Sequence, residues 1–125
     1  MQGTRVVQRF TVLLVDDDDL VRGSLMGLLE AHGCRVLVAA SGAEALRLLA
    51  QDHADVLFTD IIMPDLDGIA LAKEAKRLRP DLRVMFATGY YSRAAEAEAL
   101  GTLLFKPIRD HELGAILASV RPNDR

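Results

Sequence analysis

The 125-residue sequence has little of what several protein classes require. It contains one cysteine, Cys34, and no tryptophan. Because Cys34 opens an apolar run, we expect a buried thiol rather than a disulfide partner or a metal ligand. No segment approaches the roughly 18 consecutive apolar residues of a membrane span, and residues 1–10 lack the apolar core of a secretory signal. These absences favour a cytoplasmic protein with no membrane partner.

An excess of positive charge is also missing. The chain has 15 Lys and Arg residues against 18 Asp and Glu residues, a formal net charge of −3. Surfaces that bind nucleic acids are usually basic, so we expect no nucleic-acid partner. Half of the residues are apolar and 26% are charged, which is typical of a globular chain. This length fits one domain with a substantial core.

Short apolar runs alternate with amphipathic stretches along the chain. The apolar runs predict strands over residues 10–15, 34–39, 55–60, 82–87 and 102–105. Helices are expected between Leu20 and Gly33 and over residues 42–50, 67–78, 92–100 and 110–120. Such alternation favours a parallel sheet covered on both faces, because crossovers between parallel strands are helical and right-handed. We expect one domain over residues 10–120, with an extension at 1–9 and a tail at 121–125.

Several helices carry a recognisable start signal. Ser41 and Glu44 have the Ser-x-x-Glu spacing of a capping box. Asp18 and Asp19 are expected to lie in a solvated loop or to cap the first helix. Asp65 and Asp67 are expected to be turn and cap residues rather than metal ligands.

The polar side chains of chemical interest stand where predicted strands end. Asp16 and Asp17 follow the first strand, Asp60 ends the third, Thr88 follows the fourth and Lys106 follows the fifth. In a parallel sheet these ends share one edge. Clustered carboxylates repel one another, and hard oxygen ligands of this kind suit Mg²⁺. A carboxylate beside Mg²⁺, a lysine and a hydroxyl is suited to accept a phosphoryl group as an acyl phosphate.

This pattern resembles the receiver domain of bacterial two-component response regulators over residues 10–120. Four segments carry the resemblance, namely Leu13-Leu14-Val15-Asp16-Asp17, Asp60 to Gly68, Ala87-Thr88-Gly89 and Phe105-Lys106-Pro107. The resemblance implies an α/β fold of the CheY-like, flavodoxin-like type, a doubly wound five-stranded parallel sheet with strand order 2-1-3-4-5. It also implies a signalling domain rather than an enzyme, which assists only its own phosphorylation and dephosphorylation.

The resemblance assigns the phosphoacceptor and its metal. Asp60 matches the residue that is phosphorylated by a histidine kinase or a histidine phosphotransfer protein. Asp17 matches a direct Mg²⁺ ligand and Asp16 a ligand acting through water. The backbone carbonyl of Ile62 matches the third protein ligand.

The same resemblance assigns the groups around the phosphoryl oxygens. Thr88 and Lys106 match the residues that bind them. The peptide bond between Lys106 and Pro107 matches one that is usually cis in this family, consistent with the small cis penalty of proline.

Three features depart from the family pattern. Leu103 stands where relatives often have an aromatic ring that moves on phosphorylation, so that switch cannot operate here. The helix expected over residues 92–100 is short and marginal alone. We therefore expect residues 89–101 to be mobile without phosphate and ordered with it.

The third departure concerns the two residues beside the expected acyl phosphate. Ile62 and Tyr90 are bulky where smaller or polar residues are common, which predicts slow hydrolysis of the phosphate. The Tyr90-Tyr91 pair is either ordinary surface or a partner-facing aromatic pair.

The output of such a domain would depend on an unknown downstream protein. Residues 121–125 are too few for a DNA-binding or catalytic module, which favours a single-domain response regulator. A receiver excised from a hybrid histidine kinase or from a longer regulator is the alternative. A small Asp-dependent phosphohydrolase, using Asp16-x-Asp18 as its nucleophile motif, is a remote alternative, and an unphosphorylated interaction module is another.

Overall fold

One parallel sheet organises the chain, with the strand order β2-β1-β3-β4-β5. The computed structural model describes residues 10–120, and the expected extension at 1–9 and tail at 121–125 lie outside the described residues. The strands are β1 (Thr11–Val15), β2 (Arg35–Ala39), β3 (Val56–Asp60), β4 (Arg83–Thr88) and β5 (Thr102–Phe105). The predicted doubly wound sheet and its strand order are confirmed.

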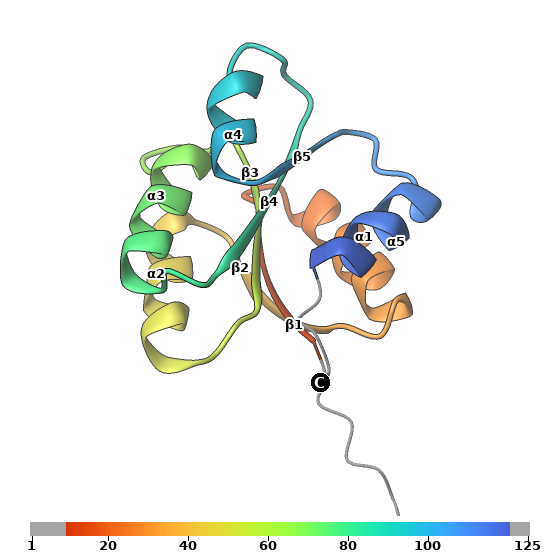
Figure 1. Ribbon diagram of the computed structural model, residues 1–125, viewed down its shortest axis with the longest axis horizontal. Coiled ribbons are helices and arrows are strands. Elements are labelled where there is room, and N and C mark those ends of the chain that lie inside the picture. Colours follow the sequence, from red (N-terminus) through yellow and green to blue (C-terminus); the bar gives the residue numbers. More distant parts are fainter. Residues whose placement is uncertain (1–9, 121–125) are drawn as a thin grey trace, which may run out of the picture.

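Helices cover both faces of this sheet (Figure 1). On one face lie α1 (Asp19–Ala31) and α5 (Asp110–Val120), and on the other lie α2 (Gly42–Gln51), α3 (Gly68–Leu78) and α4 (Ala94–Leu100). Within the described chain, no helix is both long and apolar enough to cross a membrane. The arrangement explains why the central strands read as unbroken apolar runs, since both of their faces are covered.

The strands contribute alternate side chains to two separate cores. In β1, Leu13 and Val15 pack under α2, α3 and α4, whereas Val12 and Leu14 pack under α1 and α5. All five residues of β1 are buried, while β2 at the edge is partly exposed. Cys34 is fully buried in the second core, as predicted. The residue after β1 is therefore held at the end of a rigid, doubly covered strand.

The predicted helix caps are present. Asp18, Ser41 and Asp67 occupy the N-cap positions of α1, α2 and α3, and the side chain of each accepts a hydrogen bond from a backbone N–H of the first turn. The carboxylate of Glu44 reaches back to the backbone N–H of Ala40, at 2.7 Å. These caps fix the loops that leave the strand ends.

Helix α4 begins later than predicted, at Ala94 rather than Ser92, and has seven residues. Arg93 occupies its N-cap and makes no side-chain cap bond. Its guanidinium instead binds the carboxylates of Asp67, at 2.8 Å, and Glu96, at 3.0 Å. Burial acts to raise the pKa of Asp67, but the hydrogen bonds from Ala70 and Arg93 outweigh it and lower the pKa. An ion pair to the cap of α3 thus fastens the start of this short helix.

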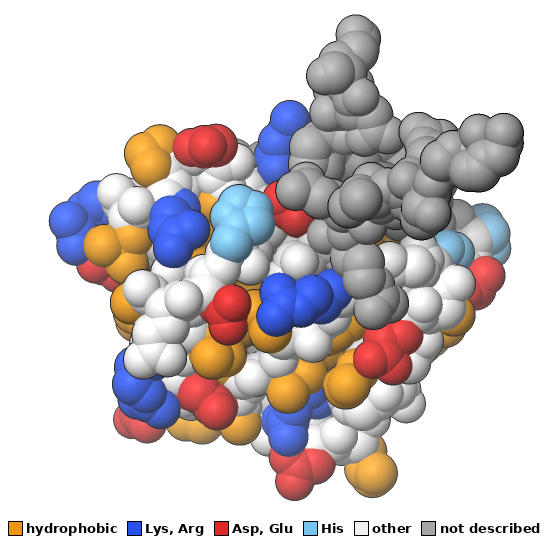
Figure 2. Space-filling view, turned by 90° about the horizontal axis from the view of Figure 1, so that it is seen from below, with side chains coloured by type: hydrophobic (Ala, Val, Ile, Leu, Met, Phe, Trp, Pro, Cys, Tyr) orange, Lys and Arg blue, Asp and Glu red, His pale blue; other side chains and the backbone are white. Residues whose placement is uncertain are grey.

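The edge of the sheet at which the strands begin carries side chains of several kinds. On the part of this face drawn in colour in Figure 2, positive, negative and apolar side chains are interspersed. His53 pairs with Asp55 at 3.0 Å, and the other carboxylate oxygen of Asp55 accepts a hydrogen bond from the backbone N–H of Thr11 at 2.8 Å. These contacts tie together the starts of β1 and β3, so the polar groups on this edge have a structural role.

Candidate functional site

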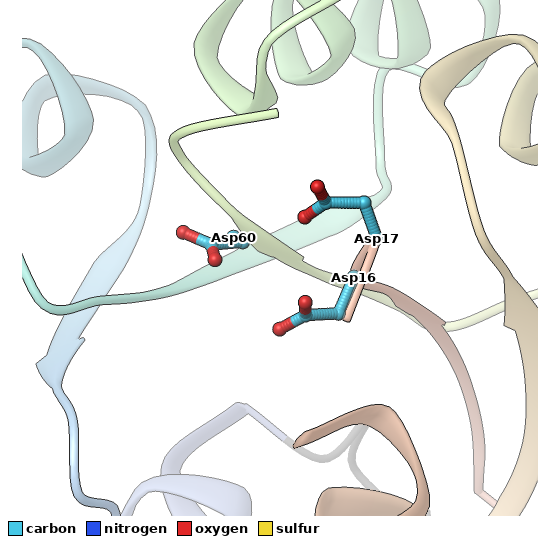
Figure 3. Close-up of side chains that lie close together, drawn as sticks. All are labelled: Asp16, Asp17 and Asp60. Carbon is cyan, nitrogen blue, oxygen red and sulfur yellow. The ribbon is translucent and has the colours of Figure 1, made fainter. Parts of the chain in front are cut away.

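Three carboxylates meet at the opposite edge of the sheet. Val15 of β1 pairs with Thr59 of β3, so the residues that follow them lie level with each other. The side chains of Asp16, Asp17 and Asp60 each place a carboxylate oxygen within 4.8 Å of the other two, and Figure 3 shows them turned to the same side of the strand ends. Asp16 is buried, Asp60 is partly buried and Asp17 is exposed. The cluster is therefore open to solvent on the side of Asp17.

Lys106 bridges two of these carboxylates. Its Nζ donates to Asp60 Oδ2 at 2.9 Å and to Asp16 Oδ2 at 3.1 Å. Burial by itself would lower the pKa of Lys106, but the hydrogen bonds to the two aspartates outweigh burial and raise the pKa. The lysine therefore stays charged. Three carboxylates against one ammonium leave a formal charge of −2 when all four groups are ionised.

This charge and donor set fit a divalent cation. All the clustered ligand atoms are carboxylate oxygens, and Mg²⁺ prefers hard oxygen ligands while keeping several waters. The exposed Asp17 lies on the side from which hydrated Mg²⁺ would enter.

The backbone N–H, the backbone carbonyl and the carboxylate of Asp16 all make hydrogen bonds. Its carboxylate accepts a hydrogen bond from the backbone N–H of Asp18 at 2.9 Å, and its own N–H donates to the carbonyl of Ala39 at 3.2 Å. Its carbonyl accepts a hydrogen bond from Arg22 Nη1 at 2.7 Å. Arg22 is not among the site residues predicted from the sequence. Its position four residues after the cap Asp18 was the available signal, because long side chains in a first helical turn point back toward the N-terminus.

Thr88 lies beside the lysine at the end of β4. It pairs with Phe105 in register, and its carbonyl accepts a hydrogen bond from the backbone N–H of Lys106 at 2.9 Å. The threonine is fully buried, and its hydroxyl oxygen accepts a hydrogen bond from the backbone N–H of Tyr90 at 3.2 Å. The next peptide bond, between Lys106 and Pro107, is cis, as the family resemblance implies.

Two exposed residues with large apolar side chains follow Asp60 and Thr88 closely in the sequence. Asp60 Oδ1 accepts a hydrogen bond from the backbone N–H of Ile62 at 3.2 Å. The residues two positions beyond Asp60 and Thr88 are exposed, Ile62 by 45% and Tyr90 by 63%. The role of the Ile62 carbonyl as a metal ligand stays a prediction.

Gly68 is a second site residue that the sequence analysis did not explain. A Cβ at this position would lie 1.9 Å from the backbone oxygen of Asp60 and 2.8 Å from its carbonyl carbon. The N–H of Gly68 donates to the carbonyl of Ile61 at 2.8 Å. The first residue of α3 therefore packs directly against the backbone of Asp60, and only glycine leaves space for that approach.

Comparisons with known proteins point to one family. A family model described as the response regulator receiver domain matches residues 12–118. The chain is 37% identical over 106 residues to the response regulator receiver protein CpdR of Brucella abortus, covering 82% of the chain and 88% of CpdR. It is also 37% identical over 103 residues to the sensor kinase CckA of that organism, covering 78% of the chain but only 11% of the kinase. Among solved structures, the chemotaxis protein CheY4 of Vibrio cholerae is similar with a TM-score of 0.83 and 28% identity, covering 90% of this chain and 99% of CheY4.

Proposed function

Because the chain belongs to the response regulator receiver domain family, we propose that it accepts a phosphoryl group on Asp60 from a histidine kinase or a histidine phosphotransfer protein. The observation that carries this proposal is the contact of Lys106 Nζ with Asp60 Oδ2, at 2.9 Å, within a cluster of three carboxylates. A lone aspartate at a strand end would have many ordinary explanations. An aspartate that shares a lysine with a second carboxylate has a cation beside it that can also bind an anionic group such as a phosphoryl group.

Mg²⁺ would be held by Asp16, Asp17, Asp60 and the carbonyl of Ile62. When bound, it would neutralise the charge of the cluster and of the incoming phosphoryl oxygens. Asp17 would be a direct ligand because it is the exposed member of the cluster. Asp16 is buried and already bound to Lys106 and to the N–H of Asp18, so it would act through water.

The chain itself would supply the nucleophile and the phosphoryl-binding groups. An Asp60 carboxylate oxygen attacks the phosphorus of the donor's phosphohistidine, so a P–O bond forms as the P–N bond breaks. The electron pair of that P–N bond stays on the imidazole of the donor. Lys106 can then move one hydrogen bond from Asp60 to a phosphoryl oxygen, and the hydroxyl of Thr88 can donate to another.

Output would follow from protein–protein interaction with a downstream protein that the sequence does not identify. We place the protein in the cytoplasm, without a nucleic-acid or membrane partner. The match over 88% of CpdR supports a single-domain response regulator. The match to 11% of CckA supports the alternative, a receiver within a hybrid kinase. The size of the protein in cells of the source organism, measured by immunoblot, distinguishes the two.

The direct test is phosphate uptake from a small phosphodonor, followed by intact mass. Wild type should gain one phosphoryl group in the presence of Mg²⁺ and little after chelation. Asp60→Asn should gain none. Asp65→Asn is the matched control, because it makes the same change in the same loop at a residue with φ of 66°, a conformation that asparagine tolerates. Equal uptake by Asp60→Asn and wild type would overturn the assignment.

A further inference from the structure

Two aromatic rings stack across the segments that carry Thr88 and Lys106. The ring centroids of Tyr91 and Phe105 are 4.3 Å apart, and the ring planes are inclined by 27°. Tyr91 comes three residues after Thr88, and Phe105 comes directly before Lys106. The stack therefore joins the β4–α4 loop to the end of β5, one residue away from the lysine of the site.

The Tyr91 side of the stack is exposed to solvent. Tyr91 is 72% exposed, whereas Phe105 is partly buried in β5. The Tyr91 ring thus stacks on Phe105 and is exposed to solvent over most of its surface. Such a ring can leave its partner without opening a cavity in either core.

The loop that carries Tyr91 is fixed at both ends. At one end, the N–H of Tyr90 donates to the hydroxyl oxygen of Thr88 at 3.2 Å. At the other end, Arg93 binds Asp67 of α3 at 2.8 Å. Rotation of the Thr88 side chain toward a phosphoryl oxygen would break the bond to Tyr90, while Arg93 keeps the far end in place. The residues between these two points must then rearrange, and Tyr91 is among them.

We propose that the Tyr91–Phe105 stack reports the phosphorylation state of this protein. The inference rests on the proposed phosphorylation of Asp60. The stack is closed in the unphosphorylated protein, as described, and it opens when Thr88 turns toward the phosphoryl group. Leu103 has no ring to rotate and packs against the core under α4. The aromatic side chain that changes position on phosphorylation is therefore Tyr91. The exposed face that changes is the one formed by the β4–α4 loop and β5.

The composition of the chain makes the opening of the Tyr91–Phe105 stack measurable. It contains two tyrosines and no tryptophan, so selective isotope labelling of tyrosine gives ring signals from Tyr90 and Tyr91 alone. Tyr90→Phe identifies which signals belong to Tyr91. Phe105→Leu removes the stacking partner and supplies the reference position of an unstacked Tyr91 ring.

The experiment records Tyr91 ring shifts by NMR before and after a small phosphodonor and Mg²⁺ are added, with phosphate uptake measured by mass on the same sample. Before phosphorylation, wild type and Phe105→Leu should differ at Tyr91. After phosphorylation, the wild-type signals should move to the Phe105→Leu position, and those of Asp60→Asn should not move.

Each other result contradicts the inference. Phosphate uptake without a change at Tyr91 overturns the reporting role and leaves the proposed function standing. A change in Asp60→Asn would mean that the donor, rather than phosphorylation, moves the ring. Identical Tyr91 signals in wild type and Phe105→Leu would show that the rings do not stack in solution. Absence of uptake by wild type overturns the inference together with the proposed function.

Discussion

Replacing Gly68 with alanine should damage phosphorylation more than it damages the fold. The new Cβ would lie 1.9 Å from the backbone oxygen of Asp60 and 2.9 Å from the Cα of Ile61. The first distance is about 1.1 Å below the 3.0 Å that real Cβ atoms keep from such neighbours. Both neighbours are backbone atoms, of Asp60 and Ile61, so neither can swing aside as a side chain would.

The size of the effect follows from this geometry. Overpacking lowers the free energy of unfolding by about 1–3 kcal/mol. Because the contact is with rigid backbone, we expect a loss of about 3 kcal/mol for Gly68→Ala. The better helix propensity of alanine returns at most about 1 kcal/mol. A net loss of about 2 kcal/mol would lower Tm by roughly 6–10 °C for a domain of this size. A displacement of Asp60 by about 1 Å would slow phosphoryl transfer by about 100-fold.

The assay is the initial rate of phosphate uptake from a small phosphodonor at saturating Mg²⁺, well below the Tm of every variant. Gly42→Ala is the matched control, because Gly42 also opens a helix but faces the side chain of Leu66, at 2.7 Å. Leu66 can shift, so we expect a smaller loss of stability and a normal uptake rate. Gly23→Ala meets nothing within 4 Å in α1 and should raise stability by about 0.5–1 kcal/mol.

A wild-type uptake rate in folded Gly68→Ala would refute this reasoning, whatever its Tm. So would an equal slowing of uptake in Gly42→Ala, because that result would attribute the effect to general destabilisation.

Three further changes test the site. Without metal, the free energy of unfolding of Asp17→Asn should exceed that of wild type by about 1 kcal/mol, with a correspondingly higher Tm, because one repulsive charge is gone. In thermal melts with Mg²⁺ at about 100 times Kd, wild type should gain about 2.7 kcal/mol and the variant less; equal gains would place the metal elsewhere. The double variant Ile62→Asn, Tyr90→Glu should lose phosphate several-fold faster than wild type in a decay assay, and an unchanged rate would contradict shielding by these side chains. The hydrogen bonds that raise the pKa of Lys106 stabilise the fold fully below the ordinary lysine pKa of about 10.5. This contribution is lost as pH rises through the pKa of the folded state. In alkaline melts wild type should therefore lose stability relative to Lys106→Met, and parallel pH profiles would contradict the lysine contacts.

Most of the fold could be predicted because its signals are local. The apolar runs of β1 and β3 are short and uninterrupted, and the caps at Ser41 and Asp67 mark helix starts within a few residues. The meeting of Asp16 and Asp60 could be predicted as well, since parallel strands end at one edge.

The parts that could not be predicted depend on contacts between residues distant in the sequence. The ion pair of Arg93 with Asp67 spans 26 residues, and α4 begins directly after Arg93 rather than at Ser92. The stack of Tyr91 on Phe105 has no local signature either. Both contacts hold residues of the segment 89–101 in the described chain. The expectation that this segment is mobile without phosphate and ordered with it is not tested by them and stays a prediction.

Gly68 illustrates a different limit. Asp67-Gly68 is typical of an ordinary turn, and the sequence offers no sign that the glycine lies against the backbone of Asp60. Only the three-dimensional path of the chain from Asp60 to α3 reveals that contact.

The most direct test of the central claim is to locate the phosphoryl group chemically. The protein would be phosphorylated by a histidine-phosphorylated donor from the source organism, reduced with borohydride, and digested for peptide mapping. Reduction converts an aspartyl phosphate to homoserine and therefore marks the acceptor permanently. We expect homoserine at position 60 alone, and none in Asp60→Asn. Homoserine at position 16 or 17 would contradict this expectation and favour a phosphohydrolase-type nucleophile at the end of β1.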